Sequence, residues 1–206
     1  MKDKKNNIFS RIGAYIIDIV IVTLLCSLIS NIRFLNPYYD EYTEASLKYS
    51  EYYSDYVNGK IELEEFNKKI EPITIDLYKY GTSNYIIALI TIVGYFGVFQ
   101  KYNNGQTIGK RILKLKVVSF EDKEVPLYLM ILRIVPMVLI GYGGIFSLMT
   151  CILIPHLLTN NVELIISSMS IINTLLGFID AEVAIVRKDK SALHDLLSKT
   201  KVIESD

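Results

Sequence analysis

Tryptophan is absent from this chain of 206 residues, and cysteine and histidine occur only twice each. Both cysteines, Cys26 and Cys151, fall inside long apolar runs, where a thiol acts as a small apolar side chain, so we expect no disulfide framework. The two histidines are too few and too far apart for a zinc site, and no cofactor is expected. The formal net charge of zero hides a strong asymmetry between segments, so the whole-chain value says nothing about nucleic-acid binding. No nucleic-acid partner is expected.

Hydrophobic residues make up 51% of the chain, and they are bunched into long runs rather than dispersed, which is typical of a membrane protein. The first run is about 21 residues long, carries Asp18 and lacks a small-x-small cleavage site, so it is read as a retained helix rather than a secretory signal. The predicted membrane spans cover residues 12–32, 84–100, 127–155 and 162–186.

Charged residues are distributed unevenly between the predicted spans. An acidic, tyrosine-rich segment at 33–83 separates the first two spans, whereas lysine and arginine dominate residues 101–126 and the tail at 187–206. Because basic loops stay in the cytoplasm, both termini are predicted to be cytoplasmic and the 33–83 insertion to be extracytoplasmic. Four crossings agree with this placement of the termini.

The third span and the insertion each contain residues that interrupt regular helices. The third span is about 29 residues long and contains Pro136 followed by several glycines, which favours a tilted or broken helix. In the insertion, Asn58-Gly59 predicts a turn between two helices. A partner-binding role for its many tyrosines remains open beside a purely structural one.

The basic loop contains a glycine-rich motif, Gly105 to Val118, that fails as a phosphate-binding loop, because only three residues separate its glycines and Arg111 follows the lysine. Beyond the glycines, apolar and basic residues alternate as in a strand, which predicts an amphipathic element on the inner headgroups. In the tail, Ser191 is expected to cap a short helix, and the strand-like stretch 200–203 is predicted to pair with 115–118.

Three ionisable residues lie inside separate apolar runs, at similar distances from basic flanks: Asp18, Arg133 and Asp180. At about 1.5 Å per helical residue they would lie at a common depth and could meet, with Arg133 as the expected partner of Asp18. Since Glu182 adds a third carboxylate, acids exceed bases, which would leave one carboxylate protonated, solvated or bound to a cation. A structural lock of buried polar contacts is the alternative.

Two further charged residues flank these spans. Arg11 lies two helical turns before Asp18 and is expected to reach the headgroups. Asp195, next to His194, is expected to pair with lysine or arginine or to cap a helix, and not to bind a metal. No serine, cysteine or carboxylate pair forms a catalytic arrangement, so the sequence does not predict an enzyme.

Several of these residues together resemble the RDD family of bacterial membrane proteins. The resemblance is carried by Arg11-Ile-Gly-Ala-Tyr-Ile-Ile-Asp18, by Gly105-Gln106-Thr107-Ile108-Gly109-Lys110-Arg111, by Arg133, and by Leu193-His194-Asp195-Leu196 with Thr200-Lys201-Val202. It implies that Arg11, Asp18 and Asp195 are the residues that give the family its name. It also implies a bacterial inner membrane location and, because some members are described as monovalent cation/proton antiporters, a role in transport.

The sequence therefore predicts an all-α integral membrane four-helix bundle, one domain over 1–206, with a helical extracytoplasmic insertion and a short cytoplasmic strand pair. The leading hypothesis is transport of a small ion or solute across the lipid bilayer, for which monovalent cation/proton antiport is one form. A homo-oligomer is expected. Asp18 and Asp180 would bind the ion, Arg133 would tune their pKa, and Arg11 would shape the entrance. The other hypothesis is a scaffold or accessory subunit that binds a partner through the tyrosine-rich insertion.

Overall fold

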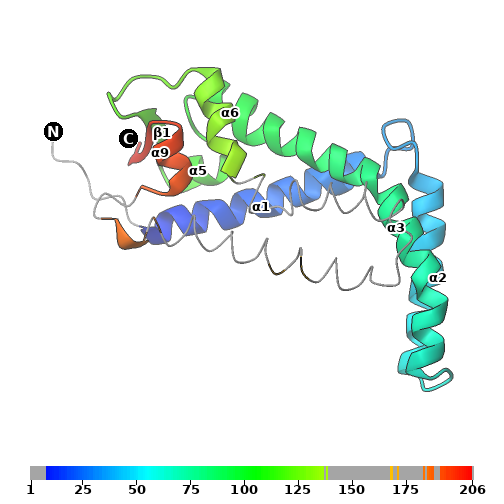
Figure 1. Ribbon diagram of the computed structural model, residues 1–206. Helices are drawn as coiled ribbons and strands as arrows, with labels where there is room; N and C mark the ends of the chain where they lie inside the picture. Colours follow the sequence, from blue (N-terminus) through cyan, green and yellow to red (C-terminus); the bar gives the residue numbers. More distant parts are fainter. Residues whose placement is uncertain are drawn as a thin grey trace.

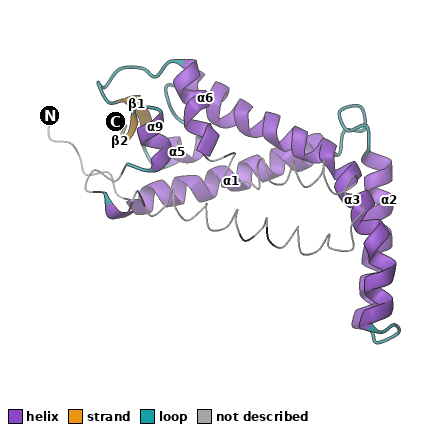
Figure 2. Cartoon of the chain, viewed as in Figure 1, coloured by secondary structure: helices purple, strands orange, loops and turns teal. Residues whose placement is uncertain are grey.

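The computed structural model describes residues 8–136, 138, 168, 171, 183, 185–187 and 191–205. In this part of the chain the structure is mostly helical, with one small pair of strands (Figures 1 and 2). The strands and the short helices gather at one end of the molecule, which we call the loop end. A helical hairpin projects at the opposite end, which we call the hairpin end.

Helix α1, Ile8–Ser30, connects the two ends. At about 1.5 Å per residue it is long enough to cross the hydrocarbon core of a bilayer. Its buried positions, Ala14, Asp18 and Val22, follow each other at intervals of four residues and therefore lie on one stripe. A second stripe of aliphatic side chains remains exposed on the helix: Ile12, Ile16, Val20, Leu24 and Leu28.

The hairpin consists of α2, Tyr39–Val57, and the first part of α3, Leu63–Ile92. The predicted turn at Asn58-Gly59 is present, and Gly59 has a φ of 69°, a conformation that glycine adopts without steric cost. Phe66 of α3 is buried there and stacks on Tyr56 of α2, with ring centroids 5.0 Å apart. Aromatic packing therefore closes the tip of the hairpin.

No helix break separates the insertion from the predicted second span, whose start at residue 84 stays a prediction. Helix α3 continues as a π-helical segment, η1, Val93–Phe99, and then as α4, Gln100–Tyr102. The resulting helical run, Leu63–Tyr102, is one of two in the described residues that are long and apolar enough to cross a membrane, α1 being the other. The second helix of the hairpin is thus continuous with the second apolar helix.

A buried polar contact fixes the hairpin to the far end of α1. Asn36 follows α1 and is almost fully buried. Its side-chain amide donates to Asn84 Oδ1 and to the Ser30 carbonyl, both at 2.9 Å, while Ser83 donates its hydroxyl to Asn36 Oδ1. Because each group has a partner, the loop after α1 is held in place without a buried unsatisfied amide.

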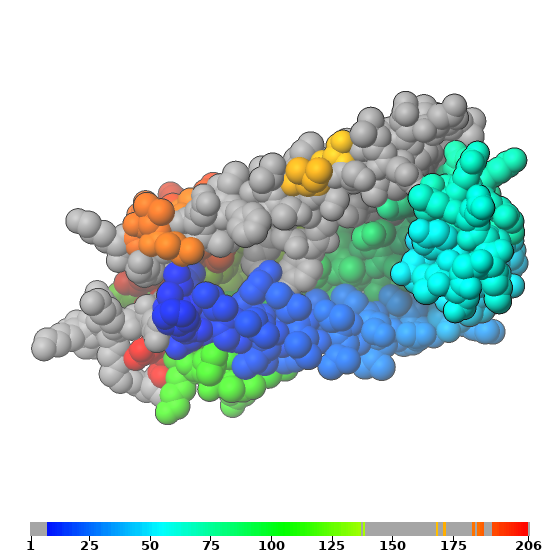
Figure 3. All heavy atoms as spheres, turned by 90° about the horizontal axis from the view of Figure 1, so that it is seen from below, coloured from blue at the N-terminus to red at the C-terminus, as the bar shows by residue number. Residues whose placement is uncertain are grey.

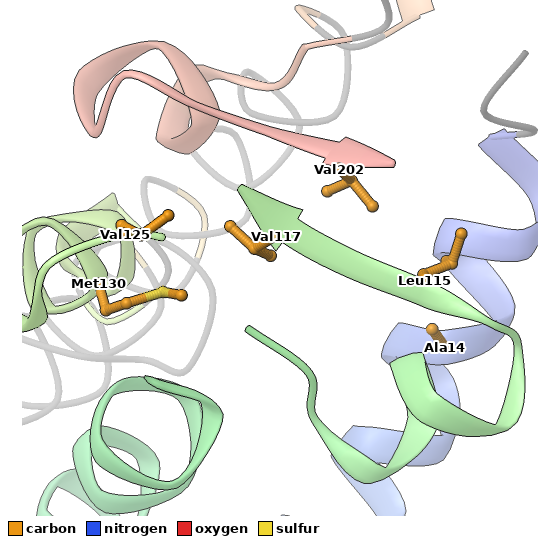
Figure 4. Packing of buried hydrophobic residues seen from close by; sticks show 6 residues of the cluster. All are labelled: Ala14, Leu115, Val117, Val125, Met130 and Val202. Atoms are coloured by element: carbon orange, nitrogen blue, oxygen red, sulfur yellow. The ribbon is translucent and has the colours of Figure 1, made fainter. Parts of the chain in front are cut away.

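At the loop end, β1, Leu115–Ser119, pairs antiparallel with β2, Thr200–Glu204, with Val117 opposite Val202. This confirms the predicted strand pair. Figure 4 shows the small core around it, in which Val117 and Val202 lie between Val125 and Met130 on one side and Leu115 and Ala14 of α1 on the other. The pair is therefore attached to the helices and is not an isolated ribbon.

Helix α6, Leu127–Pro136, packs against η1. Gly97 of η1 permits the close approach, since a Cβ at this position would lie 2.9 Å from Ile134 Cδ1. The remainder of the third predicted span and almost all of the fourth lie outside the described residues. Only isolated positions there are described, such as the helical residues 183, 185 and 186. The mostly helical fold with a strand pair agrees with the sequence, and the four-helix bundle stays a prediction.

Candidate functional site

Asp18 is the most deeply buried ionisable residue of α1, with no exposed surface. It lies on the buried stripe of the helix, between Ala14 and Val22, and faces the loop end. Burying a carboxylate is costly unless several donors compensate for the lost water. The surrounding loop supplies those donors.

Both carboxylate oxygens of Asp18 accept hydrogen bonds from groups on other elements. Tyr95 Oη donates to Oδ1 at 2.7 Å, and the backbone N–H of Gly109 donates to the same atom at 2.8 Å. The Thr107 hydroxyl donates to Oδ2. These bonds attach α5, Ile108–Ile112, to the middle of α1. Asp18 therefore anchors the basic loop to the first apolar helix.

Gly109 is where α5 approaches α1 most closely. A Cβ at this position would lie 2.3 Å from the Ala14 carbonyl oxygen and 2.8 Å from Asp18 Oδ1, so only glycine fits. The same absence of a side chain leaves the Gly109 N–H open to the carboxylate. The glycine is therefore required for the Asp18 contacts and does not form a phosphate-binding loop.

Tyr95 is placed by the π-helical segment of α3. Its hydroxyl donates to Asp18 and accepts from the Ile108 N–H at 3.1 Å, so it joins η1, α1 and α5 through one atom. The ring packs edge-on against Phe96 and stacks on Phe99. Single turns of π-helix are often found at functional sites because they redirect a side chain that an α-helix would place elsewhere.

Lys110 brings a cation to the same carboxylate. Its Nζ lies 4.0 Å from Asp18 Oδ2 and 3.4 Å from Thr107 Oγ1, and it sits 5.7 Å from the centre of the Phe96 ring. Burial lowers the pKa of the Lys110 ammonium to about 8, and the nearby Arg133 and Arg11 act in the same direction, whereas Asp18 and Asp195 oppose them. Lys110 therefore lies between two carboxylates and two guanidinium groups.

Asp195, on α9, Leu193–Leu197, is the second fully buried carboxylate of this region. Its Oδ2 accepts from Arg11 Nη2 of α1 and from the Ala192 N–H at 3.0 Å, so it caps its own helix in place of Ser191. Its Oδ1 makes an ion pair with Arg133 Nη1 of α6 at 2.5 Å. Asp195 thus ties the tail to two apolar helices.

The pKa of Asp195 reflects this arrangement. Burial raises the pKa of the carboxyl group, but Arg133, His194 and Arg11, together with the Ala192 N–H, outweigh burial and hold the pKa well below its ordinary value. The carboxylate is therefore charged throughout the physiological range. A permanently charged Asp195 keeps both ion pairs intact.

Arg133 also reaches the strand pair. Its Nη1 donates to the Thr200 hydroxyl at the start of β2, and the Thr200 and Ser198 hydroxyls lie 2.7 Å apart. Ser198 in turn donates to the His194 carbonyl at 2.7 Å. A buried chain of hydroxyl groups therefore connects α6, α9 and β2, and no side chain in it points to water.

The structure brings four of the five candidate site residues to the loop end and alters their expected pairing. Arg133, expected beside Asp18, bonds to Asp195 and Thr200, and Arg11, expected to reach the headgroups, bonds to Asp195. Asp180 lies outside the described residues. The expected excess of carboxylates rests on Asp180 and Glu182, which both lie outside the described residues, so it stays a prediction. In the described part of the site two carboxylates, Asp18 and Asp195, face three cations, Arg11, Lys110 and Arg133.

Sequence reasoning assigned no role to several residues that complete the site: Tyr95, Thr107, Gly109, Lys110 and Thr200. Four of them lie within the motifs that carry the family resemblance, so the motif itself was the available signal. Tyr95 had no such signal, because its position depends on the π-helical segment. Within the described residues, no group of three or more His, Cys, Asp or Glu side chains could hold a metal ion.

Comparison with curated proteins and with solved structures found no match. A family model does match: the description is RDD family, and it covers residues 6–199, nearly the whole chain. The match includes every described residue of the buried site except Thr200. Together with two apolar helices long enough to cross a membrane, it indicates a membrane protein. The chain belongs to the RDD family.

Proposed function

We propose that this protein is a multi-pass carrier of a small ion or solute in a bacterial inner membrane, with the loop end in the cytoplasm. The basic residues of the loop end support this orientation through the positive-inside rule. Monovalent cation/proton antiport is the form of transport we favour, by analogy with some members of the family. The Asp18 and Asp195 network, defined by these two carboxylates with Arg11, Lys110 and Arg133, would act as its cytoplasmic gate.

The observation that carries this proposal is that five ionisable side chains from separate elements lie together, three of them buried and the other two, Arg11 and Lys110, largely buried. Charged groups at the level of membrane helices are costly and are generally retained for a function. Here α1, α5, α6 and α9 each contribute at least one charge, so the network holds together only while these elements are packed. Separating α5 or α9 from α1 would expose the carboxylates to the cytoplasm.

In the arrangement described, the gate is closed. Asp18 accepts three hydrogen bonds from the protein and faces the ammonium of Lys110, so most of its roughly four acceptor sites are used internally. A carboxylate surrounded by donors cannot bind a cation until some of them leave. Transport would therefore require α5 to move away from α1, a local change of the kind that alternates access in carriers.

A scaffold or accessory subunit is the second candidate, and the projecting hairpin favours it. Helix α2 has exposed Leu47, Tyr53 and Val57 beyond the apolar part of α3, a surface suited to contact with another protein. In this role the buried charges would serve only to attach the loop and the tail to the membrane helices.

Flux measurements on purified protein in sealed vesicles separate the two candidates. Wild-type protein is given gradients of Na⁺, K⁺ and Li⁺, and an internal dye reports pH. We expect ion-driven proton flux in the wild type and a loss of about tenfold or more in Asp18→Asn, because the neutral amide cannot exchange a cation for a proton. Asp40→Asn, which alters an exposed pair with Arg33 at the hairpin end, is the matched control and should transport normally.

Tyr95→Phe gives an independent test, since it removes one hydrogen bond from Asp18 while retaining the ring that packs on Phe96. A change in flux with unchanged folding supports the gate. Absence of flux for every ion in folded wild-type protein, or full flux in folded Asp18→Asn, would rule out the antiport proposal and leave the scaffold.

A further inference from the structure

The outer surface of α5 combines aliphatic and basic side chains. Ile108 and Ile112 are one helical turn apart and are 39% and 60% exposed. Arg111 lies beside them and is exposed, and Lys114 follows the helix and is exposed as well. We call these four residues the α5 patch. One side of this five-residue helix is bound to Asp18, so the exposure of two isoleucines on its other side calls for an explanation.

The α5 patch lies at the level of the first turns of α1. Helix α5 is in direct contact with α1, because Gly109 fits against the Ala14 carbonyl and a Cβ on Gly13 would lie 3.0 Å from Leu113 Cδ1. On the face seen in Figure 3, the green atoms of this part of the chain border the dark blue atoms of α1 directly. The α1 stripe begins there with Ile12 and Ile16, which are both exposed. Because Ala14, which α5 contacts, lies between Ile12 and Ile16 in sequence, a leaflet that covers these isoleucines would extend to the depth of α5.

The basic residues of the α5 patch differ from three lysines nearby that have acidic partners. Lys101 pairs with Glu124, Lys123 with Glu121, and Lys201 with Asp122. Within the part of the chain that the structure describes, Arg111 and Lys114 have no carboxylate partner. The acidic residues of the loop thus pair with other lysines, away from the α5 patch. Among the described residues, Arg111 and Lys114 remain beside the exposed isoleucines without an acidic partner.

We propose that the α5 patch is a binding site for an anionic phospholipid of the adjacent leaflet. The isoleucines would contact the upper acyl chains, and Arg111 and Lys114 would contact the phosphate group. Anionic lipid is specified by charge: two cations without a carboxylate attract a net negative headgroup, whereas the positive group of a zwitterionic lipid reduces that attraction. At about fivefold in affinity per basic residue, a preference of up to roughly 30-fold is expected.

This site differs from the one expected from the sequence, which placed β1 on the headgroups. In the structure Leu115 and Val117 of β1 are buried in the small core of Figure 4 and cannot contact lipid. The amphipathic surface is provided instead by α5, the element just before β1. The proposal is independent of transport, since a scaffold would present the same surface.

The absence of tryptophan allows a direct test. Ile112→Trp introduces the sole tryptophan of the chain, and its fluorescence is quenched on contact with bromine atoms. The full-length variant is placed in lipid nanodiscs containing phosphatidylglycerol or phosphatidylcholine, brominated near the headgroup end of the acyl chains. We expect strong quenching by brominated phosphatidylglycerol, at least threefold more than by brominated phosphatidylcholine when both lipids are present at equal amounts.

Two matched controls define the result. Val57→Trp, on the exposed surface of α2 at the hairpin end, should not be quenched. Arg111→Gln with Lys114→Gln, added to Ile112→Trp, should abolish the lipid preference but leave contact with acyl chains. Lys123→Gln, which removes an exposed lysine already paired with Glu121, should leave the preference unchanged.

Thermal unfolding confirms that each variant is folded, and Ile108→Trp repeats the measurement one turn away should Ile112→Trp unfold. Selective quenching that depends on Arg111 and Lys114 supports the site. Equal quenching by the two lipids, no quenching at either position, or a preference that survives loss of both cations would overturn it.

Discussion

The two carboxylates at the loop end are equally buried but are held by different groups. Asp18 is held mainly by neutral donors, from Tyr95, Thr107 and Gly109, with one ammonium at 4.0 Å. Asp195 is held mainly by two guanidinium groups. Neutral donors can be replaced by water as elements separate, whereas an ion pair loses more when it opens in a dry environment. Asp18 is therefore the more easily released of the two.

Replacement of Asp195 by asparagine should reduce stability more than any exposed charge change. Arg133 would remain buried without its partner, and loss of one member of a buried ion pair costs about 3–5 kcal/mol. We expect a lower free energy of unfolding in detergent and faster amide exchange in β2. Asp122→Asn, which breaks an exposed pair with Lys201 on the same ribbon, is the control and should cost at most about 1 kcal/mol. Equal effects of the two changes would contradict this account of Asp195.

At the scale of elements, glycines set the distances between the helices. Gly109 allows α5 to contact α1, and Gly97 allows α6 to contact η1. Both contacts involve short elements, which bury too little surface to be stable alone. Their position depends on close approach to a longer helix, and so on the absence of a side chain.

Gly109→Ala should detach α5 from α1. A Cβ 2.3 Å from the Ala14 carbonyl meets backbone, which cannot rotate away as a side chain could. We expect a loss of about 3 kcal/mol in the free energy of unfolding, together with loss of the Asp18 contacts. Gly94→Ala is the matched control, since its Cβ would have no neighbour within 4 Å, and it should leave stability unchanged or slightly higher. Unchanged stability in Gly109→Ala would show that α5 is not packed as described.

Some elements could be predicted from the sequence because their signals are local. Asn58-Gly59 marked the hairpin turn, and the alternation after Leu113 marked a strand with a partner in the tail. The continuous helix from Leu63 to Tyr102 was missed, because the polar residues and Pro72 at its start resemble a segment separate from the apolar residues that follow, although the helix runs through both. The π-helical segment was missed because Val93–Phe99 has no distinctive composition.

The contacts between the site residues were harder to predict than the identity of those residues. Arg11, Asp18, Arg133 and Asp195 were identified from charge within or beside apolar runs, but matching by depth paired Arg133 with the wrong carboxylate. The correct partner depends on how α9 folds back beneath α6, which involves residues far apart in sequence. The depth of a residue along its helix does not determine which other side chain it meets, because the pairing also depends on how the elements are arranged around it.

At the scale of the whole molecule, the chain has two dissimilar ends joined by long apolar helices, as Figure 1 shows. The loop end carries the strands and the buried charges, and the hairpin end carries α2 and the polar contact around Asn36. Such polarity suits a protein with different surroundings on its two sides. The proposed orientation places the loop end in the cytoplasm.

Cysteine labelling tests this orientation. In a chain with Cys26→Ser and Cys151→Ser, the single substitutions Lys60→Cys, at the hairpin tip, and Lys123→Cys, at the turn before α6, place exposed thiols at opposite ends. A membrane-impermeant maleimide should label Lys60→Cys in intact cells and Lys123→Cys only after the membrane is opened. The reverse pattern would invert the orientation, and labelling of both in intact cells would contradict separation by a membrane.

The ion pair between Arg11 and Asp195 joins residues 184 positions apart. A ribosome that adds roughly 5–20 residues per second reaches Asp195 about ten seconds or more after it has made Arg11. During this interval α1 can already enter the bilayer, with its arginine lacking the partner it will finally have. The protein thus completes this ion pair only after Asp195 has been made, and any nascent chain stalled before Asp195 would lack the contact that joins α1 to α9.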